Sequence, residues 1–319
     1  MDLEMLRERA GIILRIRSFF ESKNYLELDT PLLSPDLIPE SCLEVFETTR
    51  LFPPGSARKN QKLYLVPSPE IWMKKIIAKH AVNIFQICKC FRNGESSGHL
   101  HNPEFTMLEY YTMNAGYLDS LELTEGLFAF LAEGGNISPP FERITVADAF
   151  GRWAGFDLFQ AAEKEGALEE EAKRLGLQPP PGIGKEALYD LIFIHAVEPQ
   201  LKSDRPVVLL DYPAFVSCLA KQKGKTVERW ELYYNGIELA NCFSEETDPA
   251  VVKSFFYSEA EKKEKSCLVK HNADFDYWKI FDREEKPFPR CSGVALGIDR
   301  LIMALVGRSN IDSILPFTL

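Results

Sequence analysis

The sequence lacks the patterns that mark a protein stabilised by zinc or by disulfide bonds. Its seven cysteines form no C-x-x-C pair, and none is paired with a histidine at a metal-binding spacing. Scattered thiols of this kind are typical of a reducing compartment. The sequence also has no apolar run of membrane-spanning length, and its N-terminal stretch is too charged for a signal peptide. We therefore expect a cytoplasmic protein without a membrane partner.

A basic excess is also missing, since 37 lysines and arginines face 47 acidic residues and give a net charge of −10. Nucleic-acid binders usually carry a basic excess, because phosphate neutralisation supplies most of their affinity. The charge balance therefore argues against a nucleic-acid partner and suits a cationic substrate. A chain of 319 residues with 45% hydrophobic content can bury a large core, as one domain or as two smaller ones.

Hydrophobic periodicity and turn residues predict an alternation of helices with strands that are joined by hairpin loops. Predicted helices cover residues 2–22, 69–80, 117–133 and 248–266, and predicted strands cover 82–91, 104–113 and 206–213. Hairpin-joined strands favour an antiparallel sheet flanked by helices, which is an α+β fold. We expect one catalytic domain over residues 1–319, with a helical insertion at about 141–200.

The stretch ELYYNGIELANCFSE carries three glutamates at seven-residue intervals, Glu231, Glu238 and Glu245. Asn-Gly at 235–236 predicts a two-residue hairpin turn in the middle of this stretch. Such a turn places Tyr233 opposite Glu238 on the neighbouring strand. The glutamates therefore belong to a β-hairpin rather than to a coiled coil.

The same turn places Glu231 opposite Ala240, so that Glu231 and Glu238 project from one face. Two converging carboxylates can hold a divalent cation such as Mg²⁺. Asn241 and Glu245 have the opposite parity, and they reach this face only if the strand bulges. A solvated sheet face is an equally good interpretation of the hairpin taken alone.

A second stretch, FRNGESSGHLHNPEFTMLEYY, places Arg92 at the end of one predicted strand. Glu109 and Tyr111 share a face of the returning strand because a strand has a period of two. Arginine is suited to bidentate contacts with a phosphate or a carboxylate. A structural ion pair explains the segment nearly as well, so this stretch alone indicates a site only weakly.

The stretches ESKNYLELDTPLL, FRNGESSGHLHNPEFTMLEYY, GIELANCFSE and GVALGIDRL together resemble the signature motifs of class II aminoacyl-tRNA synthetases, in their lysine-specific form. The resemblance runs from about residue 4 to about residue 306. Lysyl-tRNA synthetases carry an anticodon-binding domain before the first motif, and here that motif begins near Met1. The chain therefore resembles the elongation factor P–lysine ligases, a family that also has glutamine at the position of Gln86 and alanine at that of Ala295.

This resemblance implies an enzyme that uses ATP and Mg²⁺ to activate lysine or (R)-β-lysine as an aminoacyl-adenylate. The aminoacyl group is then transferred to a lysine of elongation factor P, without tRNA as a partner. It also implies a homodimer, because class II cores usually pair through their first motif.

The resemblance assigns each motif residue a role. Arg92 and Arg300 are the expected catalytic residues, holding the α- and γ-phosphates of ATP. The expected substrate-binding residues are Ser68, Pro69, Glu70, Glu109, Tyr111, Asn241, Glu245 and Ala295. The expected ATP-binding residues are Arg92, Asn93, Glu95, His101, Asn102, Glu238, Leu239, Gly297 and Arg300, and the expected magnesium ligands are Glu231 and Glu238.

Two other functions are compatible with these motifs. A free-standing lysyl-tRNA synthetase core would act on tRNA, which the acidic balance disfavours. A catalytically silent relative would bind a metabolite or a partner, which the presence of Arg92, Glu231, Glu238 and Arg300 disfavours. Cys242 follows the ELAN stretch, and we interpret it as a buried structural thiol.

Overall fold

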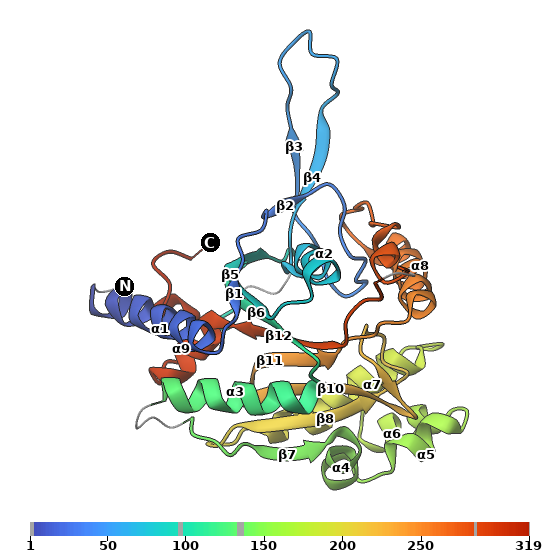
Figure 1. Cartoon of the computed structure of the whole chain (residues 1–319). Coiled ribbons are helices and arrows are strands. Elements are labelled where there is room, and N and C mark those ends of the chain that lie inside the picture. The colour runs from blue at the N-terminus through green and yellow to red at the C-terminus, as the bar shows by residue number, and fades with distance from the viewer. Residues whose placement is uncertain (1–2, 95–97, 133–136, 284–285, 319) are drawn as a thin grey trace. The chain divides into compact units, whose positions relative to one another are not determined.

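The computed structural model describes residues 3–94, 98–132, 137–283 and 286–318 (Figure 1). The chain divides into two compact units. The first unit combines residues 1–114 with residues 246–319, and the second unit consists of residues 115–245. The motif residues are accordingly divided between the units, with the two arginines in the first and the three hairpin glutamates in the second.

The first unit contains a sheet with the strand order β1-β5-β6-β12. Its strands are β1 (Leu26–Glu27), β5 (Ile84–Phe91), β6 (Glu104–Met113) and β12 (Cys291–Gly297). The short strand β1 is parallel to β5, whereas β5, β6 and β12 pair antiparallel. Both long predicted strands, at 82–91 and 104–113, are thus confirmed as neighbours.

Helix α1 (Leu3–Ser22) packs its apolar stripe onto this sheet. Phe20 is fully buried and lies with its ring 5.0 Å from that of Phe85 and 4.8 Å from that of Tyr110. Asn24 ends the helix region with a φ of 60°, the left-handed conformation that asparagine tolerates. The further helices of this unit are α2 (Glu70–His80), α8 (Pro249–Ser266) and α9 (Ile298–Leu305), with short 3₁₀ turns η4 (Tyr277–Ile280) and η5 (Ile311–Ser313).

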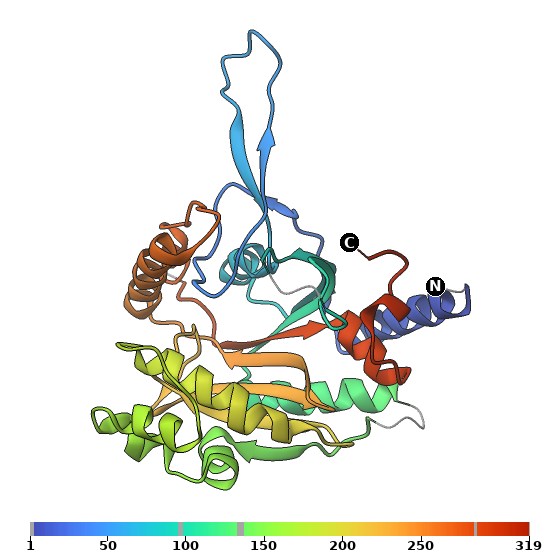
Figure 2. The same cartoon turned by 180° about the vertical axis from the view of Figure 1, so that it is seen from behind.

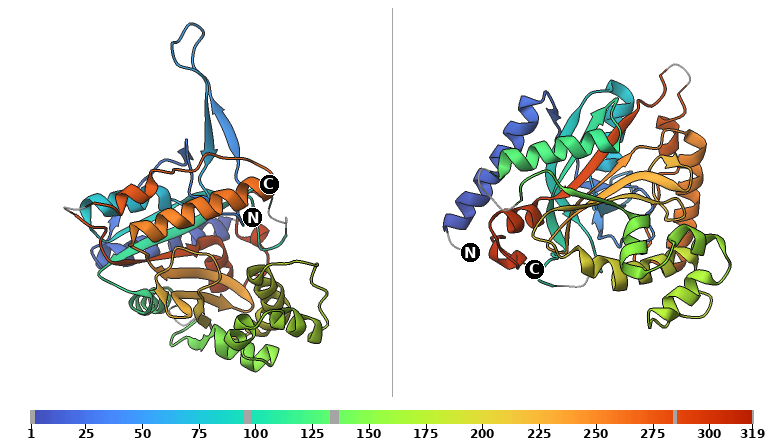
Figure 3. Two further views of the ribbon diagram at one scale, coloured as in Figure 1. Left: turned by 90° about the vertical axis from the view of Figure 1, so that its right-hand side faces the viewer. Right: turned by 90° about the horizontal axis from the view of Figure 1, so that it is seen from below.

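A small second sheet in the first unit has the order β2-β4-β3. Its strands are β2 (Leu33–Ser34), β3 (Glu47–Arg50) and β4 (Gln61–Leu65). Strands β3 and β4 form an extended hairpin, seen at the top of Figure 1 and of the left panel of Figure 3. The sequence did not predict this hairpin, because all four residues of β3 are exposed and show no apolar alternation.

The second unit is built on a sheet with the order β11-β10-β8-β7. Its strands are β7 (Glu142–Thr145), β8 (Val207–Pro213), β10 (Thr226–Tyr234) and β11 (Ile237–Ser244), and β9 (Gln222–Lys223) pairs with one end of β10. Strand β7 is parallel to β8, and the other pairs are antiparallel. The predicted α+β class with a mainly antiparallel sheet is therefore confirmed.

Helices cover both faces of the second unit's sheet. Helix α3 (Tyr117–Leu131) lies on one face, and the chain between β7 and β8 covers the other (Figures 2 and 3). That chain forms α4 (Val146–Ala149), η1 (Phe150–Ala154), α5 (Leu158–Glu163), α6 (Ala167–Arg174), α7 (Lys185–Ile192), η2 (Phe193–Val197) and η3 (Glu198–Leu201). The segment 141–200, predicted as a helical insertion, thus begins with β7 and continues as short helices.

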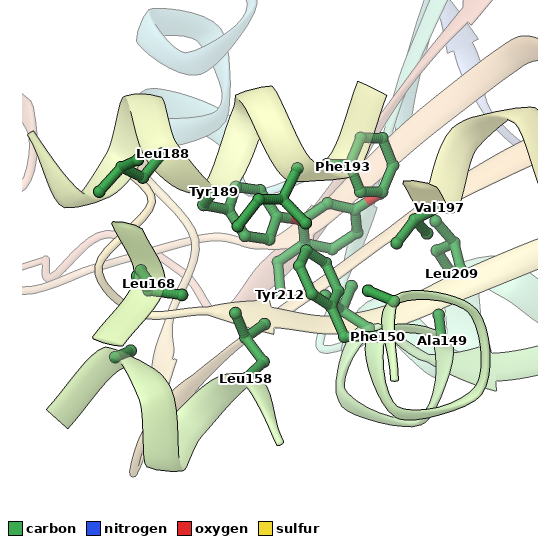
Figure 4. Packing of buried hydrophobic residues seen from close by; sticks show 14 of the residues in the cluster. Ala149, Phe150, Leu158, Leu168, Leu188, Tyr189, Phe193, Val197, Leu209 and Tyr212 are labelled. Atoms are coloured by element: carbon green, nitrogen blue, oxygen red, sulfur yellow. The ribbon is translucent and has the colours of Figure 1, made fainter. Parts of the chain in front are cut away.

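These helices bury an aromatic core against β8 and β10 (Figure 4). Phe150 is fully buried, and its ring stacks on that of Tyr189 with the centroids 5.3 Å apart. Tyr212 of β8 and Tyr233 of β10 belong to the same cluster. Within the described residues, no helix combines the length and the apolar character needed to cross a membrane.

Candidate active site

One face of the first unit's sheet carries a row of three residues from three strands. Gln86 of β5 pairs with Glu109 of β6, which pairs on its other side with Ala295 of β12. Residues directly opposite each other in a sheet share a face. Gly293 and Gly297 lie two positions from Ala295 and contribute no side chain to this face. The row therefore ends in a strip of small residues beside a buried carboxyl group.

Glu109 lies at the centre of this row and accepts hydrogen bonds from two hydroxyl groups. Ser68 Oγ donates to Glu109 Oε2 at 2.5 Å, and the Tyr111 hydroxyl donates to Oε1 at 2.7 Å. Ser68 Oγ also accepts from the backbone N–H of Glu70, at 3.0 Å, directly after Pro69 at the start of α2. The SPE stretch and the EYY stretch are therefore brought together as predicted.

Glu70 makes an ion pair that was not predicted from the sequence. Lys74, one helical turn further along α2, places its Nζ 2.5 Å from Glu70 Oε1. The Lys74 side chain is only 1% exposed, and its ammonium lies 5.9 Å from the centre of the Tyr111 ring. The i, i+4 spacing of Glu70 and Lys74 was the available signal for this pair.

The electrostatic state of Glu109 follows from its burial. Burial raises the pKa of Glu109 to about 8, and the negative charge of Glu70 adds to the increase. The hydrogen bonds from Ser68 and Tyr111 and the charge of Lys74 act in the opposite direction. A neutral glutamic acid at pH 7 is poised to ionise when a cation approaches.

Arg92 directly follows β5 and places its guanidinium over the Phe105 ring, 5.2 Å from the ring centre. Its positive charge also acts on Glu40, which the sequence analysis did not single out. Burial, followed by the charge of Glu70, raises the pKa of Glu40 to about 7, while Arg92 and Lys263 lower it. Glu40, Ser68 and Glu70 line one small cavity of about 10 Å³.

The loop between β5 and β6 brings three predicted nucleotide residues into contact with the chain around them. Arg300 Nη2 donates to His101 Nε2 at 2.7 Å, which joins the start of α9 to this loop. Asn102 donates from its amide to the Glu104 carbonyl at 2.5 Å. Asn93 accepts from the backbone N–H of Gly94 at 2.9 Å. Glu95, also predicted to bind ATP, lies outside the described residues.

The second unit contains the glutamate hairpin, and its turn is as predicted. Asn235 and Gly236 have φ values of 50° and 75°, the left-handed values that a type I′ turn requires. Tyr233 pairs with Glu238, which confirms that part of the register.

The register further along the hairpin differs from the prediction. Glu231 pairs with Asn241 rather than with Ala240, because the ladder shifts between Leu232 and Tyr233. Leu232 pairs with Ala240, and Leu239 is the extra residue of this bulge. The bulge reverses the parity of the residues that follow it. Asn241, and Glu245 by the period of two, therefore share the face of Glu231 and Glu238.

Glu231 sits in a network of protein donors. Its Oε2 accepts from the hydroxyls of Tyr212, at 2.6 Å, and Tyr233, at 2.7 Å. Its Oε1 forms an ion pair with Arg229, whose guanidinium lies 4.4 Å from the centre of the Tyr212 ring. Both oxygens of this buried carboxylate thus have donors within the chain, which disfavours the predicted role of Glu231 as a metal ligand.

The other hairpin residues differ in their exposure. Glu238 and Asn241 are half-buried, whereas Leu239 and Glu245 are buried. The backbone of Glu245 forms an isolated bridge with Ala220. Cys242 is fully buried on the opposite face, so the burial that we predicted for this thiol is confirmed.

Comparison with known proteins identifies the chain's relatives. The family of class II tRNA synthetases (D, K and N) matches residues 3–319. The chain belongs to this family. It is 34% identical to the "Elongation factor P–(R)-beta-lysine ligase" of Avibacterium paragallinarum, over 100% of this chain and 96% of that protein. Proteins of the same name from Vibrio cholerae, 34% identical, and Haemophilus influenzae, 33% identical, each match over 99% of this chain and 95% of their own length.

This membership identifies the chain as an ATP-using enzyme of the ligase class with a class II synthetase fold. Within the first unit, the predicted amino-acid residues meet around Glu109, and Arg300 meets His101. Within the second unit, Glu238, Asn241 and Glu245 share a face, whereas Glu231 belongs to the Tyr212 network.

Proposed function

We propose that the chain activates lysine or (R)-β-lysine with ATP and transfers it to a lysine of elongation factor P. The observation that carries the proposal is the acidic cluster of the buried Glu109 and the half-buried Glu70, held by Ser68, Tyr111 and Lys74. Burying the charge of a carboxylate as deeply as Glu109 is unfavourable unless a cation compensates it. The relatives named above act on elongation factor P and (R)-β-lysine, according to their names.

The acidic cluster gives the amino-acid substrate its binding groups. The substrate has two ammonium groups, and Glu70 and Glu109 are carboxyl groups that can each accept hydrogen bonds from one. Glu70 is already neutralised by Lys74, whereas Glu109 has no cationic partner within hydrogen-bonding distance among the described residues. We infer that Glu109, with Tyr111, binds the more deeply placed ammonium, and that Ala295 limits the width of the pocket beside it.

In the first unit, ATP is assigned to residues of the β5–β6 loop, β12 and α9. The residues of β11 that the resemblance assigns to ATP belong to the second unit. In this assignment Arg92 faces the α-phosphate and the reacting carboxylate, and Arg300, aligned by His101, faces the γ-phosphate. The further ATP contacts are proposed for Asn93, Glu95, Asn102, Glu238, Leu239 and Gly297.

We propose that magnesium binds at the hairpin of the second unit. Within the described part of the chain, no group of three or more metal-ligating side chains converges. Mg²⁺ commonly takes only one or two carboxylates and completes its shell with water and phosphate oxygens. Of the two predicted ligands, we assign it to Glu238, which is half-buried on the hairpin. Glu231 is buried, and both its oxygens are engaged by Tyr212, Tyr233 and Arg229. When bound, the ion neutralises charge on the triphosphate.

The first step joins the substrate carboxylate to the α-phosphorus of ATP, and the bond to pyrophosphate breaks. The attacking carboxylate is already ionised, so the step needs no general base. The guanidinium of Arg92 orients the attacking oxygen and stabilises the charge that develops on the α-phosphate. In the second step, the ε-amine of the acceptor lysine attacks the carbonyl carbon after losing a proton, and AMP leaves.

The test is the intact mass of elongation factor P after incubation with ATP, Mg²⁺ and each lysine isomer. We expect a mass gain of one lysyl group, no charging of tRNA, and a homodimer in solution. At limiting magnesium, Glu238→Gln should strongly reduce the gain, whereas Glu261→Gln, an exposed residue paired with Lys265 on α8, should not. Lysyl-tRNA as the main product would support a tRNA enzyme, and no lysine-dependent pyrophosphate exchange would support a silent relative.

A further inference from the structure

Gln86 is a buried amide that the roles above leave unexplained. Its side chain lies in the middle of β5 and is 1% exposed. Neither its Oε1 nor its Nε2 has a hydrogen-bond partner among the residues that the structure describes. A buried carboxamide without partners is unfavourable, because it has lost its hydrogen bonds to water and gained none in return.

The register shows where this amide points. Gln86 pairs directly with Glu109, so the two side chains share a face, with their Cβ atoms roughly 4.5–5.5 Å apart. Glu109 itself already accepts hydrogen bonds on both oxygens, from Ser68 and Tyr111. The amide therefore lies beside the acidic centre of the amino-acid pocket.

The hydrogen-bonding groups of the amide limit the kinds of ligand that it can bind. A carboxamide offers one acceptor oxygen and one donor NH₂ group. The phosphates of ATP only accept hydrogen bonds, whereas an ammonium group only donates them. Because Gln86 lies next to Glu109, which binds cations when ionised, an ammonium group is the ligand that suits its oxygen.

We propose that Gln86 is a specificity-determining residue of the amino-acid pocket, whose carboxamide oxygen accepts a hydrogen bond from the substrate ammonium that Glu109 binds. This inference rests on the proposed function and names a second acceptor for the same group. Gln86 adds this acceptor without adding charge. Since Lys74 neutralises Glu70 and the substrate neutralises Glu109, a further carboxylate at this position would lack a cation.

The proposal is tested with Gln86→Met, which keeps the length of the side chain and removes both polar atoms. We expect the KM for lysine or (R)-β-lysine in pyrophosphate exchange to rise about tenfold, a loss typical of one hydrogen bond to a charged group. The KM for ATP should stay within twofold. The melting temperature without substrate should be unchanged or higher, because a partnerless amide has been removed from the core.

Two further variants and one binding measurement sharpen the test. Gln86→Glu keeps an acceptor in place and should bind the amino acid better than Gln86→Met does. Gln222→Met makes the same chemical change on an exposed strand, where Gln222 donates to the Gly224 carbonyl, and should leave the KM unchanged. The rise in melting temperature caused by the amino acid alone should be large for the wild type and small for Gln86→Met.

The outcomes separate this inference from the proposed function. An unchanged KM and an unchanged substrate-induced melting shift in Gln86→Met would overturn the role of Gln86 alone. A lower melting temperature of Gln86→Met, together with equal rises in KM for the amino acid and for ATP, would also overturn the proposal. That result would show that Gln86 has a structural role. If the wild type binds no lysine isomer at all, the proposed function fails first.

Discussion

At the scale of single residues, Glu109 is the group whose titration should govern substrate binding. Its pKa of about 8 means that the free enzyme holds this carboxyl mainly protonated at pH 7. Binding of a substrate ammonium favours the ionised form, so binding releases a proton below that pKa. The affinity for lysine must therefore increase as the pH rises toward about 8.

We expect the KM for lysine to fall between about pH 6.5 and about pH 8.5, by up to about tenfold per pH unit below the pKa. The KM for ATP, measured in the same pyrophosphate-exchange assay, is the internal control and should vary much less. Glu109→Gln should weaken lysine binding and remove the pH dependence. A flat wild-type profile would contradict the assigned role of Glu109.

Glu231 and Glu238 should behave differently when each is changed to glutamine. Glu231 is paired with Arg229 inside the protein, and breaking a buried pair costs about 3–5 kcal/mol. Urea denaturation should show that Glu231→Gln lowers the free energy of unfolding by an amount of this order. Glu238→Gln should keep its stability and instead need more magnesium for pyrophosphate exchange.

The matched control for both variants is Glu261→Gln, whose exposed pair with Lys265 should leave the urea midpoint unchanged. If Glu231→Gln kept its stability but needed more magnesium, Glu231 would be a metal ligand after all, as the sequence alone had indicated.

At the scale of secondary-structure elements, the hairpin shows what a sequence pattern can and cannot predict. The Asn-Gly turn is a local property, and its left-handed φ values were predictable from the residue types. The bulge at Leu239 depends on which backbone groups pair across two strands. The pattern of apolar and polar residues is compatible with either register, so the faces of Asn241 and Glu245 could not be predicted.

The turn itself can be tested by two glycine substitutions in the second unit. A Cβ at Gly236 would lie 2.9 Å from Lys202 Cγ, at a φ of 75°. Gly224 also has a positive φ, 66°, but a Cβ there would meet nothing within 4 Å. Gly224→Ala should therefore cost about 1 kcal/mol from backbone strain alone, and Gly236→Ala at least about 2 kcal/mol.

Urea denaturation of both variants measures this difference in the free energy of unfolding. Equal losses would show that Lys202 moves aside without cost and that the turn is less tightly fixed than its contacts indicate. The two glycines have similar positive φ values, so the cost of backbone strain is similar in both variants. The difference between their free energies of unfolding therefore reports the contact with Lys202.

At the scale of the whole molecule, the sequence motifs identified the chemistry, while the environment of each motif residue became visible only in the folded chain. Ser68 and Glu109 are 41 positions apart, and their hydrogen bond depends on α2 starting beside β6. Tyr212 reaches Glu231 from a neighbouring strand. Contacts of this kind leave no periodic signal. The sequence resemblance marked Gln86 as a family position, but only the folded chain shows that its amide is buried without a partner among the described residues.

The buried acids should also set the pH dependence of the molecule's stability. The pKa values of Glu40 and Glu109 are raised, to about 7 and about 8, from an ordinary value of 4.5. Between the ordinary and the raised values, the folded chain binds more protons than the unfolded chain. The stability that these two groups contribute is fully present below about pH 4.5. It is lost as the pH rises through their raised pKa values of about 7 and about 8.

We expect the melting temperature of the substrate-free wild type to fall between about pH 5.5 and about pH 8.5, relative to the double variant Glu40→Gln/Glu109→Gln. The variant has no carboxyl groups at these positions, so its difference from the wild type isolates their contribution from all other titrations. At the upper pH the variant should melt at least about 2 °C higher. Saturating lysine should reduce the decline in the wild type, because the bound ammonium compensates the ionised Glu109. A difference in melting temperature that stays constant across this pH range would mean that both acids have ordinary pKa values. The acidic cluster would then not need a cationic substrate to balance its charge.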